Sequence, residues 1–479
     1  MIAFLIAVAA LIGGYFIYGA LVERVIGCDP KRQMPCYTKQ DGVDYLPLPT
    51  WKVFLIQFLN IAGLGPIFGA IMGIMFGPAA FLWIVFGTVF AGAVHDFLSG
   101  VISIRRDGAS LPEIVGSELG VGVKQLMRGF SLLLMMLVGA VFVLTPADLI
   151  AGMTPGWMDT RFWVIAIFAY YMLATVLPID KLIGNIYPVF GFALLFMAAG
   201  IMGVLIFGDV TIPTGISDGW YNRNADAEAL PLFPMMFVSI ACGAISGFHA
   251  TQSPMMARCL KNEKLARPVF YGAMVAEGLV ALIWAAAAIA FTGGYSQLGE
   301  YLAANGGAGG LVHNISISWL GTFGGILAIL GVIAAPITTG DTALRSARLI
   351  ASDFMHYEQR TTVRRLAVSI PIFAVTFFIM QIDFNVLWRY FAWCNQTLAV
   401  FTLWAVTVYL ARHGKIYWIT MLPAMFMTCV CTTYILFAPE GLQLDYNLSL
   451  GAGVVVSLLA GILFMRKMVF AKRFNVIED

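Results

Sequence analysis

Charged residues are scarce in this 479-residue chain: Asp, Glu, Lys and Arg make up 11% of it, whereas hydrophobic residues make up 60%. Soluble globular proteins carry about 25% charged residues. A chain this poor in charge cannot cover its apolar core with a polar surface, which excludes a soluble enzyme or a nucleic-acid-binding domain. The composition predicts an integral membrane protein whose bulk lies in the lipid bilayer.

Several signatures of chemistry are also missing. The seven cysteines form no C-x-x-C pair; Cys28 and Cys36 share one polar loop, and we interpret them as reduced thiols rather than metal ligands. No nucleotide-binding P-loop occurs, which argues against an ATP-driven pump unless another subunit supplies the ATPase. No cleavable signal pattern marks residues 2–22, so we expect a retained first helix. We expect no enzymatic activity and no resident cofactor.

Long apolar runs are abundant. A helix needs about 20 apolar residues to cross a bilayer. Thirteen runs meet this need, and we predict an all-α polytopic protein with spans at 2–22, 53–77, 78–103, 129–150, 161–179, 186–208, 231–254, 268–292, 317–340, 366–382, 386–410, 416–438 and 447–465. A short interfacial helix is also predicted within 110–122.

The positive residues orient these spans. Cytoplasmic loops of membrane proteins collect Lys and Arg. With thirteen spans and the C-terminus inside, 25 of the 28 Lys and Arg residues fall on the cytoplasmic side, and only Arg161, Arg223 and Arg389 fall outside. We therefore predict a multi-pass membrane protein with its N-terminus outside and its C-terminus in the cytoplasm.

The second span contains helix-weakening residues at its centre: Gly63, Gly65, Pro66 and Gly69. An interior Gly costs up to about 1 kcal/mol and an interior Pro about 3 kcal/mol relative to Ala. Unwound backbone inside a membrane is tolerated only around a ligand, an ion or water. We expect free amides near Ile67 and Phe68 to bind a carboxylate. The alternative is that Gly65 and Gly69 only permit close helix packing.

A second break is predicted in the seventh span. Residues 242–249 read CGAISGFH and place Gly243, Ser246, Gly247, Phe248 and His249 inside an apolar run. The two broken spans lie five spans apart and run in opposite directions. This is the inverted-repeat plan of secondary transporters, which bind cargo at such breaks. We expect an extra N-terminal helix and loop (1–52), two LeuT-like five-helix repeats (53–230 and 231–412) and two C-terminal helices (413–479).

Polar residues elsewhere in the spans suggest sites for a coupling cation. His95 and Asp96 lie together in the third span, and His249 titrates near neutral pH, so a proton could use them; hydrogen-bonded structural roles are the alternative.

The ninth span ends with Ala335, Thr338, Thr339 and Asp341. In sodium symporters of the LeuT fold, the third helix of the second repeat supplies a similar Ala-x-x-Thr-Thr/Ser run. We therefore expect a candidate sodium site there, completed by the carbonyl of Ala62, with hydroxyls bonded back to their own helix as the alternative. Asn395 and Gln396 are interpreted as polar contacts between helices.

Several of these motifs, in the order in which they occur, make the chain resemble the carbon-starvation (CstA) family of bacterial peptide and pyruvate transporters. The resemblance rests on seven stretches that span most of the chain, namely 41–45, 62–66, 91–96, 105–108, 240–250, Asp341 with 345–348, and 395–396. It implies an inner-membrane symporter for peptides or small carboxylates such as pyruvate. The chain resembles a shorter form of the family. It lacks the histidine pair expected near residues 56–58, and this favours sodium as the coupling ion over a proton carried by such histidines.

From the sequence we therefore predict a secondary active transporter, a cation symporter, for a small carboxylate or peptide nutrient. The coupling ion is a proton or sodium. A passive channel, an amino-acid symporter of the same fold and a membrane-embedded enzyme are the alternatives. The expected partners are the cargo and the lipid bilayer, without nucleic acid; the sequence leaves the oligomeric state open.

Overall fold

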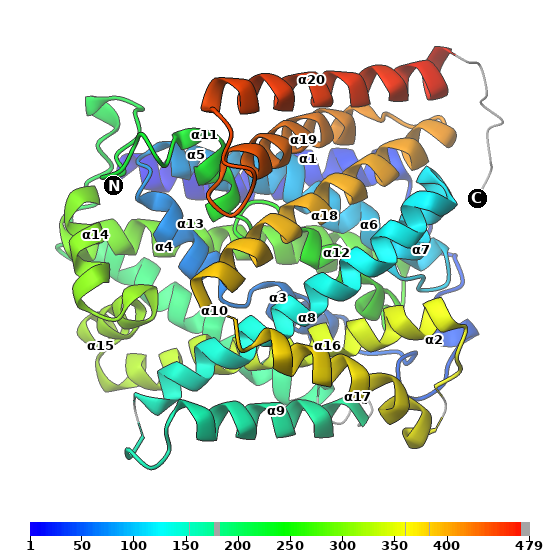
Figure 1. Cartoon of the computed structure of the whole chain (residues 1–479), viewed down its shortest axis with the longest axis horizontal. Coiled ribbons are helices and arrows are strands. Elements are labelled where there is room, and N and C mark those ends of the chain that lie inside the picture. Colours follow the sequence, from blue (N-terminus) through cyan, green and yellow to red (C-terminus); the bar gives the residue numbers. More distant parts are fainter. Residues whose placement is uncertain (153, 177–182, 360, 383, 471–479) are drawn as a thin grey trace.

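The computed structural model describes residues 1–152, 154–176, 183–359, 361–382 and 384–470, and helices are the only regular secondary structure in these ranges. Most of the long helices run side by side along one direction (Figure 1). The predicted all-α membrane fold is confirmed. Residues 177–179 of the fifth predicted span lie outside the described residues.

The first half of the chain, up to the second break, contains α1 (Ile2–Ile26), α2 (Pro35–Thr38), α3 (Thr50–Ile61), η1 (Gly65–Gly69), α4 (Ala70–Ile74), α5 (Ala79–Gly87), η2 (Thr88–Gly92), α6 (Ala93–Arg105), α7 (Leu111–Leu119), α8 (Val121–Ala151), α9 (Thr160–Val176), α10 (Ile183–Phe207), η3 (Ile216–Asp218) and α11 (Leu232–Ser239). The second half contains α12 (Gly247–Ala257), η4 (Glu263–Leu265), η5 (Arg267–Tyr271), α13 (Gly272–Thr292), α14 (Tyr295–Ala304), α15 (Gly307–Ala328), η6 (Ile329–Ile333), α16 (Ala334–Met355), α17 (Thr362–Ile379), α18 (Phe384–Arg412), α19 (Trp418–Phe437), α20 (Tyr446–Phe464) and η7 (Met465–Phe470).

Length and hydropathy make nine of the described helices candidate membrane spans. Two further helix pairs qualify when each bent pair is counted as one span, which gives up to eleven. The helix α9 is a shorter apolar helix, and α11 with α12 forms the second predicted break. Every predicted span therefore meets a helix or a broken helix, while the count of thirteen crossings stays a prediction.

The ninth predicted span has the wrong bounds. Residues 317–340 straddle a bend of 57° between α15 and α16, and α16 continues to Met355. The apolar run misplaced this helix because its second half is polar: Asp341, Arg345 and Arg348 are all fully buried within it. Arg345 and Arg348 were expected in a cytoplasmic loop, and they lie instead inside the bundle. Thr338 and Thr339 consequently lie in the first turns of α16 rather than at its end.

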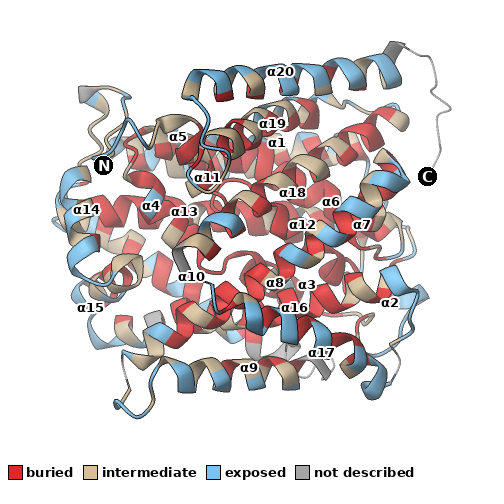
Figure 2. Cartoon of the chain, viewed as in Figure 1, coloured by how far each residue is buried: buried red, intermediate tan, exposed pale blue. Residues whose placement is uncertain are grey.

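The core is formed by helices that are buried on all sides. In Figure 2, α12, α13 and α6 are largely buried, whereas α20 and α9 at the margins expose one side. Beyond Asn447 in its first turn, the exposed side chains of α20 are apolar, among them Val455, Leu459 and Ile462. An apolar outer surface over a polar interior is the arrangement expected of a protein surrounded by lipid.

The connecting segments gather at two opposite ends of the bundle. The start of α1 lies at the same end as α14 and α15, and α2 and α7 lie at the other end (Figure 1). The short helix predicted within 110–122 is present as α7, which follows Ser110, although the Ser110 side chain makes no capping hydrogen bond. Its place at the membrane interface stays a prediction. The two ends agree with the relative sidedness expected from the positive residues.

Candidate functional site

The first break lies between α3 and α4. The α-helix stops at Ile61, the chain turns through Ala62 at φ −83° and ψ 54°, and the π-helical turn η1 begins at Gly65 with Pro66 in its first turn. The two parts are bent by 53°. The amides of Ile67 and Phe68 donate to the carbonyl of Leu64, at 3.2 and 2.8 Å. These amides were expected to be free, and in this structure they are paired, because the π-helical turn bends back on Leu64.

The second break separates α11 from α12. Residues 240–246 leave the helical conformation, with Ser246 extended at φ −143° and ψ 124°. Asn395 of α18 holds this segment: its Oδ1 accepts from the Ser246 hydroxyl at 3.0 Å and from the Phe248 amide at 2.7 Å. The hydroxyl of Thr88 donates to the Gly243 carbonyl at 3.0 Å. The expected bridging role of Asn395 between helices is therefore observed.

The two breaks pack against each other. A Cβ atom at Gly65 would lie 2.2 Å from the Cβ of Cys242, and a Cβ at Gly69 would lie 2.9 Å from the carbonyl oxygen of Ser239. From the other side, a Cβ at Gly243 would lie 3.8 Å from the Cα of Pro66. Close packing, the alternative considered for Gly65 and Gly69, is thus present. Whether the same glycines also contact cargo stays a prediction.

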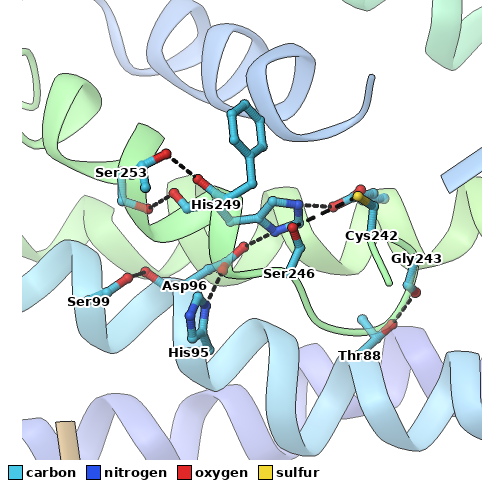
Figure 3. A network of polar contacts seen from close by, with 12 residues as sticks. Thr88, His95, Asp96, Ser99, Cys242, Gly243, Ser246, His249 and Ser253 are labelled. Atoms are coloured by element: carbon cyan, nitrogen blue, oxygen red, sulfur yellow. Dashed lines mark hydrogen bonds and ion pairs between the residues drawn. The ribbon is translucent and has the colours of Figure 1, made fainter. Parts of the chain in front are cut away.

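A network of acid and imidazole groups lies beside the second break (Figure 3). Nδ1 of His95 is 2.7 Å from Oδ1 of Asp96, and Nδ1 of His249 is 2.9 Å from Oδ2 of the same carboxylate. All three side chains are fully buried. Helix α6 supplies His95 and Asp96, and α12 supplies His249 one turn after the break, so the structure brings together the three residues expected to carry a proton.

Glu277 of α13 completes this network, and the sequence reasoning missed it. Its Oε2 lies 3.4 Å from Nε2 of His249, and the side chain is fully buried without a hydrogen-bond partner among the described residues. A signal was available, because Glu277 is the one acidic residue of the apolar helix Gly272–Thr292. An ionisable residue inside a membrane helix marks a functional site by default. We call His95, Asp96, His249 and Glu277 the proton cluster.

The threonines expected to bind sodium lie where α16 meets α3. The Thr339 hydroxyl donates to the carbonyls of Leu59, at 3.0 Å, and Ala335, at 2.9 Å. The Thr338 hydroxyl donates to Ala335 at 2.7 Å. A Cβ at Gly63 would lie 3.2 Å from Oγ1 of Thr339. The structure therefore places these threonines next to the first break, with both hydroxyls bonded to carbonyls of the chain.

Asp341 does not join the threonines. The Tyr187 hydroxyl of α10 donates to its Oδ2, and Arg345 follows one helical turn later. The residues expected to bind the coupling ion thus fall into three separate places in the structure. These are the proton cluster, the threonine pair bonded to Leu59 and Ala335, and Asp341 with Tyr187.

Two buried amides in α3 were not predicted to be functional. Gln57 and Asn60 are fully buried, and neither end of either amide has a hydrogen-bond partner among the described residues. They lie three residues apart, on one face of the helix that leads into the first break. Buried polar groups are nearly always hydrogen-bonded in proteins. These amides are therefore candidates for contact with a polar cargo or with water.

The loop cysteines Cys28 and Cys36 are not in a disulfide in this structure. Burial, reinforced by the charge of Glu263, raises the pKa of the Cys28 thiol to about 12. Burial likewise raises the pKa of Cys36 to about 11. Protonated thiols are poor metal ligands. Within the described ranges, no group of three or more His, Cys, Asp and Glu side chains is arranged to hold a metal ion.

Two broken helices packed against each other inside an all-helical bundle are typical of secondary-transporter folds. The sequence profile of the carbon starvation protein CstA family matches residues 1–158, 156–307 and 299–434. The chain belongs to this family, whose characterised members are transporters rather than enzymes.

Similar bacterial proteins support this assignment. An uncharacterized membrane protein of Haemophilus influenzae is 44% identical over 61% of this chain and 91% of its own length. The peptide transporter CstA of Campylobacter jejuni is 27% identical over 89% of this chain and 78% of its own. The pyruvate/proton symporter BtsT of Escherichia coli is 30% identical over 55% of this chain and 45% of its own.

Solved structures share the fold. A manganese transporter from Eremococcus coleocola superposes with a TM-score of 0.52 at 14% identity, covering 91% of this chain and 99% of that one. The transporter MhsT in complex with L-phenylalanine gives a TM-score of 0.52 at 16% identity, covering 86% and 97%. At such identities the likeness concerns the fold alone, which is LeuT-like as predicted.

Proposed function

We propose that this protein is a proton-coupled symporter that takes up a small carboxylate or short peptide across the bacterial inner membrane, with its N-terminus outside. The observation that carries the proposal is the 3.4 Å contact between Nε2 of His249 and Oε2 of Glu277. Sodium at the threonine pair is the alternative for the coupling ion.

The chemistry of this contact requires a proton. When Nδ1 of His249 donates to Asp96, the neutral ring presents only a lone pair at Nε2. A lone pair and a carboxylate oxygen repel each other at 3.4 Å unless a proton lies on one of them. The contact therefore has a protonated form with an attractive hydrogen bond and a deprotonated form with uncompensated buried charge, which is costly away from water.

The position of the proton cluster couples that proton to the breaks. His249 lies in the first turn of α12, directly after the segment that Asn395 and Thr88 hold in place. Glu277 lies on α13, and this helix packs against α3, η1 and α4, the elements that form the first break. A proton gained or lost here changes the contact between helices that carry both breaks. Symport requires such a link, since ion and cargo must favour the same state.

The cargo is proposed from the chemistry of the breaks and from the names of relatives. Peptides and pyruvate, named for relatives of this chain, both carry a carboxylate. The unpaired amides of Gln57 and Asn60 beside the first break offer donors to such a group. A cavity of about 270 Å³ lies near the same break, lined by Asp148, Gly309, His313 and neighbouring residues, and the ring of Phe68 lies against Gly309. We assign this cavity to the outer approach to the site.

The experiment is uptake of radiolabelled pyruvate and of a radiolabelled dipeptide into proteoliposomes, with a proton or a sodium gradient imposed one at a time. Wild type is expected to accumulate cargo with the proton gradient. Glu277→Gln, which cannot change charge, is expected to lose at least about tenfold in accumulation while it keeps counterflow exchange within about threefold.

Glu300→Gln is the matched control, because Glu300 is an exposed residue of α14. It is expected to accumulate cargo like wild type. If a sodium gradient alone drives accumulation, and Glu277→Gln leaves that accumulation unchanged, proton coupling is contradicted. The threonine pair is then the candidate ion site. Uptake that ignores both gradients contradicts symport and favours a channel.

A further inference from the structure

A second set of buried charges lies at the end of the bundle that carries α2 and α7. It consists of four arginines, Arg258, Arg345, Arg348 and Arg365, which we call the arginine cluster. Arg345 and Arg348 are fully buried, and Arg258 and Arg365 are 6% and 7% exposed. None of them belongs to the proton cluster, and Arg348 lies nine residues, or about 14 Å of helix, beyond Thr339.

One carboxylate from a loop faces all four arginines. Asp41 folds residues 41–45 into a tight turn by accepting the amides of Val43, Asp44 and Tyr45. The turn points Asp44 inward, where its Oδ1 lies 3.7 Å from Nη1 of Arg345 and 3.8 Å from Nη2 of Arg348. Burial raises the pKa of Asp44, but the charges of Arg348, Arg345, Arg258 and Arg365 outweigh it and hold the pKa below its ordinary value.

The contacts of Arg348 are incomplete. Its Nε, Nη1 and Nη2 atoms are buried and have no hydrogen-bond acceptor among the described residues, and Oδ1 of Asp44 has no donor within hydrogen-bond distance. A structural ion pair between arginine and aspartate normally closes to about 2.8 Å, with two parallel hydrogen bonds. Five N–H donors in a planar fork match a carboxylate. Arg348 therefore presents a carboxylate-binding group that the chain itself does not fill.

Other carboxylates lie near the arginine cluster. Asp341 is on α16 with Arg345 and Arg348, and Asp353 interacts with Arg258. Because arginine cannot release its proton, the guanidinium group of Arg348 stays charged, and an anion at its unfilled donors is favoured.

A polar cavity borders the arginine cluster at Arg258. It has a volume of about 420 Å³ and is lined by Tyr45, Arg106, Arg258, Ser352 and further residues of the same end. Ser352 lies one helical turn after Arg348 on α16, and Arg258 stacks on the ring of Tyr45 at 4.9 Å. Tyr45 of the turn 41–45 and Arg258 of the arginine cluster thus line the cavity, whereas Arg345 and Arg348 lie behind this lining.

We propose that Arg345 and Arg348 form a carboxylate-binding site on the cytoplasmic half of the transporter, and that Asp44 occupies it as a tethered competitor when no cargo is bound. The class of ligand is a monocarboxylate or the C-terminal carboxylate of a peptide on its way out. The role of the site in releasing cargo to the cytoplasm rests on the proposed function. Its ability to bind a carboxylate does not.

The test measures binding without any ion gradient. The thermal unfolding midpoint of the purified full-length protein is followed against pyruvate, acetate and chloride at constant ionic strength. Pyruvate and acetate are expected to stabilise wild type with a saturable dependence. Asp44→Asn is expected to lower the apparent Kd for acetate at least about threefold, and Arg348→Gln to raise it at least about tenfold.

Arg364→Gln is the matched control, because Arg364 is an exposed arginine of the same region, and it is expected to bind acetate like wild type. If Arg348→Gln does not fold, the Asp44→Asn measurement decides. A Kd that Asp44→Asn leaves unchanged overturns the proposal, since a site at the breaks would be insensitive to this loop residue. Chloride that binds as tightly as acetate overturns the assignment to carboxylates. Both results are independent of Glu277→Gln, so failure of symport and failure of this site are distinguishable.

Discussion

The proton cluster and the arginine cluster are both buried, yet they differ in how their charge can be balanced. Histidine and glutamate can take up or release a proton, so the proton cluster can adjust its own charge. Guanidinium groups stay charged at every relevant pH, so the arginine cluster needs an anion. In the proposed symporter this difference separates two tasks, because one cluster is suited to a proton that binds and dissociates and the other to a charged cargo.

The location of the clusters follows the same division. The proton cluster joins α6, α12 and α13, where a change in charge acts on the helices that carry the breaks. The arginine cluster lies on α16 and on the helix ends beside a loop, where a bound group can exchange with Asp44. A coupling site must lie within the moving parts, whereas a release site needs an opening to water.

The largest expected effect is that of Asp96→Asn. The amide cannot accept from both imidazoles as a charged carboxylate does, so His249 loses the charge that fixes its tautomer. Proton-driven accumulation in proteoliposomes is expected to fall by about tenfold or more. Ser99→Ala is the control, because the Ser99 hydroxyl bonds only to the backbone oxygen of Asp96. If Asp96→Asn accumulates cargo within twofold of wild type, Asp96 does not take part in proton coupling. The contrast between the proton cluster and the arginine cluster is then weaker.

A smaller effect is expected for Gly247→Ala. The added Cβ would lie 2.4 Å from the backbone of Asn395 and Ala399, so α12 must shift and carry His249 with it. Such overpacking costs about 1–3 kcal/mol and lowers the unfolding midpoint. Uptake is expected to fall, while acetate binding at the arginine cluster persists.

Gly13→Ala is the matched control for that variant, because a Cβ at Gly13 meets nothing within 4 Å. The measurements are the thermal midpoint, uptake and the acetate titration. Loss of acetate binding together with uptake in Gly247→Ala would show that the two clusters are not separate.

Thr339→Ala is expected to change function less. It removes the hydrogen bonds to Leu59 and Ala335, which contribute about 1 kcal/mol net to stability. Proton-driven uptake is expected to stay within about threefold of wild type, with Thr339→Ser closer to it. A loss as large as that of Glu277→Gln, rescued by sodium, would make the threonine pair the coupling site.

The smallest effect concerns a charged group outside the spans. Burial raises the pKa of Glu113, but hydrogen bonds from Lys124 and Arg128 outweigh it, and the pKa lies below its ordinary value. Its contribution to folding is therefore present above the unfolded pKa and is lost as the pH falls through the folded pKa. Because the pair is partly exposed, we expect at most about 1 kcal/mol. Thermal midpoints of Glu113→Gln and wild type, compared at neutral pH and near pH 3, check this, and the difference is expected to vanish at low pH.

Sequence reasoning found most of the helices, both breaks and three members of the proton cluster. Apolar length and glycine content are local properties, so they can be read without a fold. Glu277 was missed because a lone acid in an apolar helix does not reveal its neighbours. The bounds of α16 were wrong because hydropathy assumes that lipid surrounds a helix, whereas this helix is buried in protein and keeps its arginines there.

The packing of the two breaks is a second feature that sequence reasoning could not predict. Gly65 and Gly243 were expected to open toward cargo, and each lies against the opposite break. Small residues allow close approach, but the sequence does not say whether a ligand or another backbone makes that approach.

The sequence by itself determined that this chain is a bundle of membrane helices, because the bilayer imposes the same length and polarity on every span, and it located two interrupted helices by their glycines. Only the tertiary structure decided which charges meet. Asp96, His249 and Glu277 come from three helices, and Asp44 reaches Arg348 across some 300 residues. Electrostatic contacts act over a few ångströms of space, whatever the separation along the chain.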